Sequence, residues 1–303
     1  MSPGLAALPW RGPGPGRPED LPLPPERMPL RFAGGNRKRW RYLGAFSDEV
    51  MVCAARVSVG PASQTFWAVW DRERRELTER TVMRLPGARG EVWFEDASGA
   101  PVDNAPDEGS VVRIEGKLPE AGGGRGFLRT GAGEWAECVC PNGENGFVWT
   151  RKRVVPVEID LRFGERRIRC TGRGVEDESA GYHPKHTVWS WSAGVGVLTD
   201  GREVGWNLVE GVNDPAERSE RAIWVDGVPF EPGPVEFGGL GGVTFDDGSR
   251  IECDAEAERS RTEKRGPISY SYRQPFGTFT GTLPGSLELA SGMGVMESHD
   301  ARW

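Results

Sequence analysis

Three Asp-Gly pairs in the second half of the chain constrain the fold more than any other feature. They lie at 200–201, 226–227 and 247–248, and each separates two short runs that are apolar or alternate between apolar and polar residues. An Asp-Gly pair between such runs is typical of a β-hairpin turn, because tight hairpin turns need a positive φ that glycine adopts readily. The spacing therefore predicts a series of short antiparallel strands.

An unbroken alternation at 157–163 indicates the same kind of structure. Apolar side chains occupy the odd positions and charged side chains the even positions. This is the pattern of a strand with one buried face. Gly164-Glu165 predicts a turn into another strand at 166–170. By similar patterns, further strands are expected at 50–59, 64–70, 92–94 and 111–115.

Helix is expected almost nowhere. The one helix-like stretch, 71–84, is rich in glutamate and arginine but has few apolar residues, so a helix there would bury little surface. We interpret 71–75 as the charged tip of a hairpin, and the Gly-rich segment 122–126 as a loop. Many short strands are typical of sandwiches and barrels, and the chain is too long for one eight-stranded barrel. The predicted fold is all-β, in two antiparallel barrel-like halves.

The chain is expected to have three parts. Residues 1–30 contain nine of the 24 prolines, which prevent sheet ladders and helices. We therefore expect a tail or an extended strap without secondary structure, and removal of residues 1–25 should leave the fold intact. The first β-domain is predicted at 31–165 and the second at 166–303.

Composition limits the partners and the compartment. Acidic residues outnumber basic ones by 45 to 38, for a net charge of −7, which argues against a nucleic-acid-binding protein. The five cysteines include no CxxC pair and are typical of reduced thiols. No apolar run is long enough for a membrane-spanning helix, and no signal peptide is recognisable. We expect a soluble, cytoplasmic protein, and its oligomeric state is open.

Residues that can carry chemistry concentrate in two segments, 174–191 and 294–303, which contain all three histidines. Both segments mix carboxylates, imidazoles and large aromatic rings. Because barrels leave no free edges, the last strand is expected to return beside earlier ones and bring the two segments to one cavity. The candidate catalytic residues are Asp177, Glu178 and His183, and the candidate ligand-binding residues are Tyr182, Trp189, Trp191, Asn207, Glu297 and His299.

Purely structural explanations of the same residues stay open. Trp189 and Trp191 share one face of a strand, and aromatic rings often only fill a barrel interior. The charged residues near the C-terminus could form a surface ion cluster of little energetic weight. The histidines lack the spacing of zinc ligands, and Cys138 and Cys140 are interpreted as a core pair, so no metal site is predicted. Nucleophile-elbow, phosphate-loop and dinucleotide-binding motifs are absent.

Seven segments carry a resemblance to a known family through their order and spacing: 37–42, 147–152, 157, 177–184, 189–191, 206–208 and 297–303. In these segments the sequence resembles a bacterial family called domain of unknown function 2804, and the resemblance covers about residues 31–303. That family is distantly similar to carotenoid 1,2-hydratases, tocopherol cyclases and lipocalin-like cyclases, several of which act on apolar polyene or prenyl substrates without a cofactor.

The resemblance implies two lipocalin-like barrels or half-barrels packed together, and it leaves two functions open. One is the binding of a small, largely apolar ligand in a lipocalin-like pocket. The other is a cofactor-free hydratase, isomerase or cyclase that uses a carboxylic acid as proton donor. In that case Asp177 or Glu178 would be the acid, and Tyr182, Trp189 and Trp191 would stabilise a cation. A closed apolar pocket with the acid pointing inward would favour catalysis.

Overall fold

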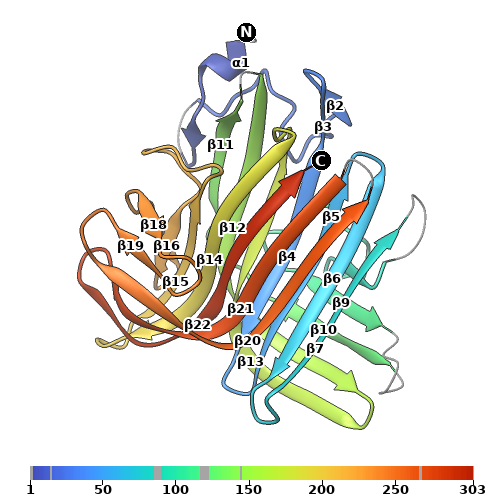
Figure 1. The fold of residues 1–303 in the computed structure, drawn as a ribbon, viewed down its shortest axis with the longest axis vertical. Helices are drawn as coiled ribbons and strands as arrows, with labels where there is room; N and C mark the ends of the chain where they lie inside the picture. The colour runs from blue at the N-terminus through green and yellow to red at the C-terminus, as the bar shows by residue number, and fades with distance from the viewer. Residues whose placement is uncertain are drawn as a thin grey trace.

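The computed structural model describes residues 3–13, 16–84, 90–116, 123–143, 145–265 and 268–302. Within these ranges the only helix is α1 (Pro3–Ala6). Two large antiparallel sheets, which curve around one another in Figure 1, hold nearly all of the remaining regular structure. The predicted all-β fold in two barrel-like halves is therefore confirmed.

The first sheet has the strand order β7-β6-β5-β4-β13-β12-β10-β9-β8, and β11 lies beside β12 with the short β1 at its edge. The elements are β1 (Trp10–Arg11), β4 (Lys38–Phe46), β5 (Val50–Val59), β6 (Ala62–Asp71), β7 (Glu76–Arg84), β8 (Val92–Glu95), β9 (Val111–Gly116), β10 (Gly124–Thr130), β11 (Ala136–Asn142), β12 (Gly146–Phe163) and β13 (Arg166–Gly181). A separate small hairpin joins β2 (Arg31–Phe32) to β3 (Gly35–Asn36).

The second sheet has the order β17-β16-β15-β14-β22-β21-β20-β19-β18. Its strands are β14 (His186–Leu198), β15 (Glu203–Glu210), β16 (Ala222–Val225), β17 (Val228–Phe230), β18 (Val235–Phe237), β19 (Gly242–Phe245), β20 (Arg250–Arg265), β21 (Ile268–Leu283) and β22 (Leu287–Arg302). Strand β22 pairs with β14 on one side and β21 on the other, so the end of the chain returns to the centre of the sheet.

The hairpins predicted from the Asp-Gly pairs are all present. They join β14 to β15, β16 to β17 and β19 to β20. Asp226 and Gly227 both have positive φ, 49° and 82°, as a two-residue turn requires. The segment 71–75 is also a hairpin tip, because β6 ends at Asp71 and β7 begins at Glu76.

The prediction of a loop at 122–126 is wrong for residues 124–126, which begin β10, and Gly122 lies outside the described residues. Gly126 pairs with Leu161 of β12. A Cβ atom at Gly126 would come within 2.3 Å of the Asp160 carbonyl oxygen. Glycine here allows two strands to approach closely, and the sequence alone does not distinguish that role from a turn.

The chain crosses from the first sheet to the second between Gly181 and His186. Strand β13, which the predicted boundary at 165/166 assigned to the second domain, pairs with β12 along its whole length and also with β4. β12 and β13 form one hairpin around Gly164, and hairpin partners belong to the same sheet. We therefore propose a domain boundary after Gly181.

Three clusters of buried apolar side chains lie within and between the two sheets. One lies within the first sheet and includes Trp67 and Ile159, and another lies within the second and includes Trp206 and Phe279. A further cluster contains residues of both sheets and so joins them. Its largest buried members are Tyr42, Phe46, Met51, Trp70, Trp191, Trp224 and Phe276.

The N-terminal segment is a strap, and the expectation that it lacks secondary structure is wrong. It contains α1, and Trp10 of β1 pairs with Val139 of β11. Figure 1 shows it against the upper end of β11. Four of its apolar side chains are buried against the first sheet: Trp10, Leu21, Leu23 and Met28.

Removing residues 1–28 is expected to lower the melting temperature by roughly 5–10 °C. Each of the four buried side chains contributes about 1.5–3 kcal/mol, partly offset by the entropy of ordering the strap, and 1 kcal/mol corresponds to about 2–4 °C in a large domain. Thermal circular dichroism measures the change. A variant lacking only residues 1–7 keeps Trp10 and is the control. An unchanged melting temperature after the longer deletion would show that the strap is not part of the core.

Candidate functional site

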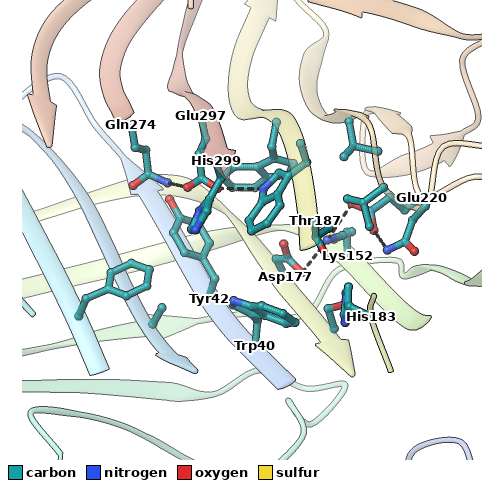
Figure 2. Close-up of a pocket in the computed structure, with 18 residues that line it drawn as sticks. Trp40, Tyr42, Lys152, Asp177, His183, Thr187, Glu220, Gln274, Glu297 and His299 are labelled. Carbon is teal, nitrogen blue, oxygen red and sulfur yellow. Dashed lines mark hydrogen bonds and ion pairs between the residues drawn. The ribbon is translucent and has the colours of Figure 1, made fainter. Parts of the chain in front are cut away.

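A cavity of about 120 Å³ lies between the two sheets, and Figure 2 shows the residues that line it. Its walls are mainly apolar. The large rings are Trp40 and Tyr42 from β4, Phe66 from β6, and Trp189 and Trp191 from β14. A concave, mainly apolar space with several aromatic rings and a few polar groups is the usual form of a small-molecule site.

Three side chains that line the cavity lie in one row across the first sheet. Asp177 of β13 is paired in register with Lys152 of β12 on one side and with Tyr42 of β4 on the other. Residues opposite each other on neighbouring strands share a face of the sheet. The register of the three strands therefore places an ammonium, a carboxyl and a phenol group on the same wall.

Charged groups gather at one end of the cavity. The Lys152 ammonium lies 2.6 Å from Asp177 Oδ1 and 3.4 Å from Glu220 Oε1. Asn213 Nδ2 donates a hydrogen bond of 2.7 Å to Glu220 Oε2. The Lys152 and Glu220 side chains are buried, and that of Asp177 is 16% exposed. One cation thus faces two carboxyl groups in a nearly dry environment.

Burial raises the pKa of Asp177 to about 6, even though the attraction of Lys152 acts in the opposite direction. The nearby Glu220 carboxyl group also raises it. Burial lowers the pKa of Lys152, but the attraction of Asp177 and Glu220 outweighs this and leaves the pKa above its usual value. Lys152 therefore stays charged at neutral pH. Asp177 gains and loses its proton at a pH close to neutral.

The opposite end is organised around Glu297, as Figure 2 shows. Trp189 Nε1 donates to Glu297 Oε1 at 3.0 Å, and Gln274 Nε2 donates to Glu297 Oε2 at 2.7 Å. His299 Nδ1 lies 3.4 Å from Glu297 Oε1, and the His299 ring stacks on Trp189 with 4.0 Å between ring centroids. The pairing of Trp189 with His299 between β14 and β22 places them together.

Aromatic contacts hold the middle of the cavity in shape. The ring of Trp191 meets Tyr42 edge-on, with centroids 5.3 Å apart. His183, in the crossing between the sheets, contacts Trp40 edge-on at 5.0 Å. Burial, together with the nearby Lys38 charge, lowers the pKa of His183 to about 3, so its ring is neutral at physiological pH.

The structure brings most of the residues proposed from the sequence to this one cavity. The two segments meet because β22 lies beside β14. The proposed residues that line the cavity are Asp177, His183, Trp189, Trp191, Glu297 and His299.

Glu178, Tyr182 and Asn207 do not line it. Glu178 follows Asp177 on a strand and so points to the other face, where it lies 3.3 Å from Arg41 and 2.7 Å from Arg151. The Tyr182 hydroxyl donates to the Pro29 carbonyl at 2.8 Å, beneath the strap. Asn207 lies behind the wall and accepts a 2.8 Å hydrogen bond from Trp191 Nε1.

Several cavity residues were not predicted, among them two aromatic residues of β4 and four side chains with charged or amide groups. Trp40 and Tyr42 lie two apart on a strand, the same signal that identified Trp189 and Trp191, and could have been found in that way. The others come from separate strands and loops, and no local pattern marks them. They are Lys152, Asn213, Glu220 and Gln274.

No group of three or more His, Cys, Asp and Glu side chains within the described ranges is arranged to hold a metal ion. Cys138 and Cys140 lie with their sulfur atoms 3.8 Å apart in the core. Among the helices that the structure describes, none is long and apolar enough to cross a membrane.

Comparisons with known proteins agree with this architecture. A family model for a domain of unknown function, DUF2804, matches residues 131–303. Kievitone hydratase from Nectria haematococca has a similar structure, with 9% identity, 88% of each chain covered and a TM-score of 0.52. CghA with Sch210972 has 11% identity, 88% of each chain covered and a TM-score of 0.51. No curated protein sequence matches the chain. At these identities the structural likeness concerns the fold, and it confirms the predicted lipocalin-like half-barrels.

Proposed function

The chain belongs to the DUF2804 family, and on that premise we propose that it is a hydratase- or isomerase-type enzyme that protonates a carbon–carbon double bond in a small, largely apolar substrate. The observation that carries the proposal is the Asp177 carboxyl group, which lines an aromatic cavity and is buried enough for its pKa to reach about 6. A carboxylic acid that is partly protonated near neutral pH is suited to general acid catalysis. A structural neighbour, kievitone hydratase, carries the name of a hydratase, which supports the reaction class.

Asp177 fits the role better than Glu178, which was also a candidate. The Glu178 carboxylate lies against Arg41 and Arg151 on the other face of the sheet. It is held in ion pairs by two guanidinium groups there, and it does not line the cavity.

The proposed reaction balances without a further reagent. The Asp177 proton and the π electrons of the alkene form a C–H bond, which leaves a carbocation and the Asp177 carboxylate. Lys152, 2.6 Å away, stabilises that carboxylate. The π faces of the wall rings, such as Trp189 and Trp191, favour the cation. Water then adds its oxygen to the cation and returns a proton to Asp177. Loss of a different proton from the cation would give an isomerised alkene instead.

Binding without chemistry is the second candidate. The 2.6 Å ion pair with Lys152 favours the carboxylate form of Asp177. If that form predominates, the site retains its aromatic walls and polar ends and holds a ligand without protonating it.

Isotope labelling separates the two functions. The protein is incubated in ¹⁸O-labelled water with a panel of prenylated phenols, terpenoid alkenes and polyenes, and products are analysed by mass spectrometry. Hydration adds one labelled water to a substrate, and the same panel in D₂O reveals isomerisation through C–D bonds. Protein-free samples are the control. If compounds bind but none gains label in either solvent, the enzymatic proposal fails and binding alone remains.

Lys152→Met is expected to extend activity to higher pH. In the native protein the rate should fall about tenfold per pH unit above about 6, where Asp177 loses its proton. Removing a cation that favours the carboxylate raises the pKa of Asp177 further. The pH above which the rate falls should therefore rise by about one unit. The pH–rate profile measures the shift, and the exposed Lys185→Met is the control. A fall in rate that begins at the same pH as in the native protein, or at a lower pH, would contradict the assignment of Asp177 as the acid.

A further inference from the structure

Buried polar atoms without partners concentrate around the cavity. In the described part of the chain, six buried side-chain atoms lack a hydrogen bond, and four of them belong to residues that line this cavity. One of the four, Asp177 Oδ1, is ion-paired with Lys152. The other three are Tyr42 Oη, Asn213 Oδ1 and His183 Nδ1. Each unsatisfied buried group costs about 1–3 kcal/mol, so this concentration needs an explanation other than the stability of the fold.

The Tyr42 hydroxyl group forms no hydrogen bond with the described part of the protein. The residue is 6% exposed, and its ring packs edge-on against Trp191, a contact that phenylalanine would make equally well. Burial raises the pKa of Tyr42 well above its ordinary value, so the group stays a neutral hydroxyl. It is therefore able both to donate and to accept a hydrogen bond with a molecule in the cavity.

The orientation of the Asn213 amide is set by its neighbour. Asn213 is 7% exposed and has a φ of 51°, in the turn between β15 and β16. Its Nδ2 donates to the Glu220 carboxylate, and the flipped amide would instead place two acceptors against each other. Oδ1 is therefore the atom left without a partner, and an amide oxygen only accepts hydrogen bonds.

From these atoms we infer that the cavity selects an apolar molecule bearing a hydroxyl group, which donates to Asn213 Oδ1, and that Tyr42 Oη binds a second polar atom of the same molecule. This inference rests on the cavity being the substrate site of the proposed function, and it names the substrate class. A carboxylate in place of the hydroxyl is disfavoured, since it would face an acceptor oxygen beside Glu220. The aromatic walls account for the apolar body of the molecule.

The test compares three probes with the same ring system: 2-naphthol, 2-methylnaphthalene and 2-naphthoate. The first two differ by a hydroxyl in place of a methyl group and have nearly the same size. Isothermal titration calorimetry on the full chain is expected to show 2-naphthol binding at least about tenfold more tightly than either of the others, the range expected for one buried hydrogen bond.

Asn213→Gly is expected to reduce that preference about tenfold. Tyr42→Phe should leave it in place, because 2-naphthol has no second polar atom, but should remove about tenfold of any tighter binding of 2,6-dihydroxynaphthalene, which has one. Glycine at 213 removes the side chain and accepts the positive φ without strain. Ser286→Gly is the matched control, because Ser286 also has a positive φ, 61°, but is exposed at the turn between β21 and β22. Tyr42→Phe should melt at or above the native temperature, since it removes an unpaired buried hydroxyl, so weaker binding by this variant would not reflect unfolding.

Equal affinity for the three probes, no binding of 2-naphthol, or a preference for 2-naphthol that survives Asn213→Gly would overturn the inference. Asp177→Asn separates this result from the proposed function, because the amide cannot act as the proton donor but leaves Tyr42 and Asn213 in place. If the 2-naphthol preference holds and the isotope experiments find no turnover, only the enzymatic proposal fails.

Discussion

Asp177→Asn is expected to lower turnover by about 100- to 10,000-fold, the usual contribution of a general acid. Asparagine has nearly the same shape as aspartic acid, so the cavity and the aromatic walls keep their form. Its amide has no proton acidic enough to transfer to carbon. The measurement is kcat on a substrate identified by isotope labelling, together with the affinity for 2-naphthol. We expect that affinity to change by less than about threefold, because the proposed partner of the hydroxyl group, Asn213, is unchanged.

Asp254→Asn is the matched control, since it makes the same chemical change on an exposed position of β20. It should leave turnover and binding unchanged. Retention of more than about a tenth of the native kcat by Asp177→Asn would be too much for loss of the acid and would contradict its role.

Arg153→Met is expected to cost about 3–5 kcal/mol of the free energy of unfolding, because it leaves a buried carboxylate without its partner. Arg153 of β12 has no exposed surface, and its Nε donates to Glu176 Oε2 at 2.6 Å. Its two terminal nitrogens donate to the carbonyls of Asp107 and Pro106, at 2.8 and 2.9 Å. The guanidinium also lies 4.2 Å from the centre of the Trp135 ring. Urea unfolding measures the loss.

Two further variants show whether the uncompensated charge is the cause. Arg153→Met combined with Glu176→Met removes both charges and should recover more than half of the loss, as replacement of buried ion pairs by apolar residues often does. Arg167→Met breaks an exposed pair with Asp160, at 3.0 Å, and should cost less than about 1 kcal/mol. A double variant no more stable than the single one would point to the lost carbonyl hydrogen bonds instead.

Strands were predictable from the sequence where one face is open to solvent. In β12, alternation is clear at 157–163, where exposed or partly exposed residues separate buried ones. It disappears at 147–155, where nearly every residue is buried because both faces of the strand are covered. Three consecutive basic residues, 151–153, form ion pairs there with carboxylates of β13, so neither an alternating nor a continuous apolar pattern marks the first half of this long strand.

The burial of the N-terminal strap was not predicted from its sequence either. Proline limits which hydrogen bonds a segment can make, and 1–30 does contain little regular structure. It does not limit burial, however. Leu21 and Leu23 lie next to prolines and are still almost completely buried against the first sheet.

The site was predictable only as far as it is local in sequence. Asp177, Trp189 and His299 were found because chemistry-bearing residues concentrate in two short segments. Tyr42 lies beside Asp177 only through the register of β4 with β13, which joins residues more than a hundred positions apart. Lys152 lies beside Asp177 across the β12–β13 hairpin, far from the turn at Gly164 that the sequence predicts. Asn213 and Glu220 come from the connection between β15 and β16, which has no periodic pattern.

The residues that line the cavity come from two parts of the chain. Asp177, Lys152, Glu220 and Asn213, which form its charged end, all lie within the segment 131–303 that the family model matches. Three of its rings, those of Trp40, Tyr42 and Phe66, lie before that segment. Relatives that retain the matched segment but diverge in the first 130 residues are expected to keep Asp177, Lys152 and Asn213 and to differ in these rings. Under the proposed function, the shape of the bound molecule would then vary within the family while the proton donor stays the same.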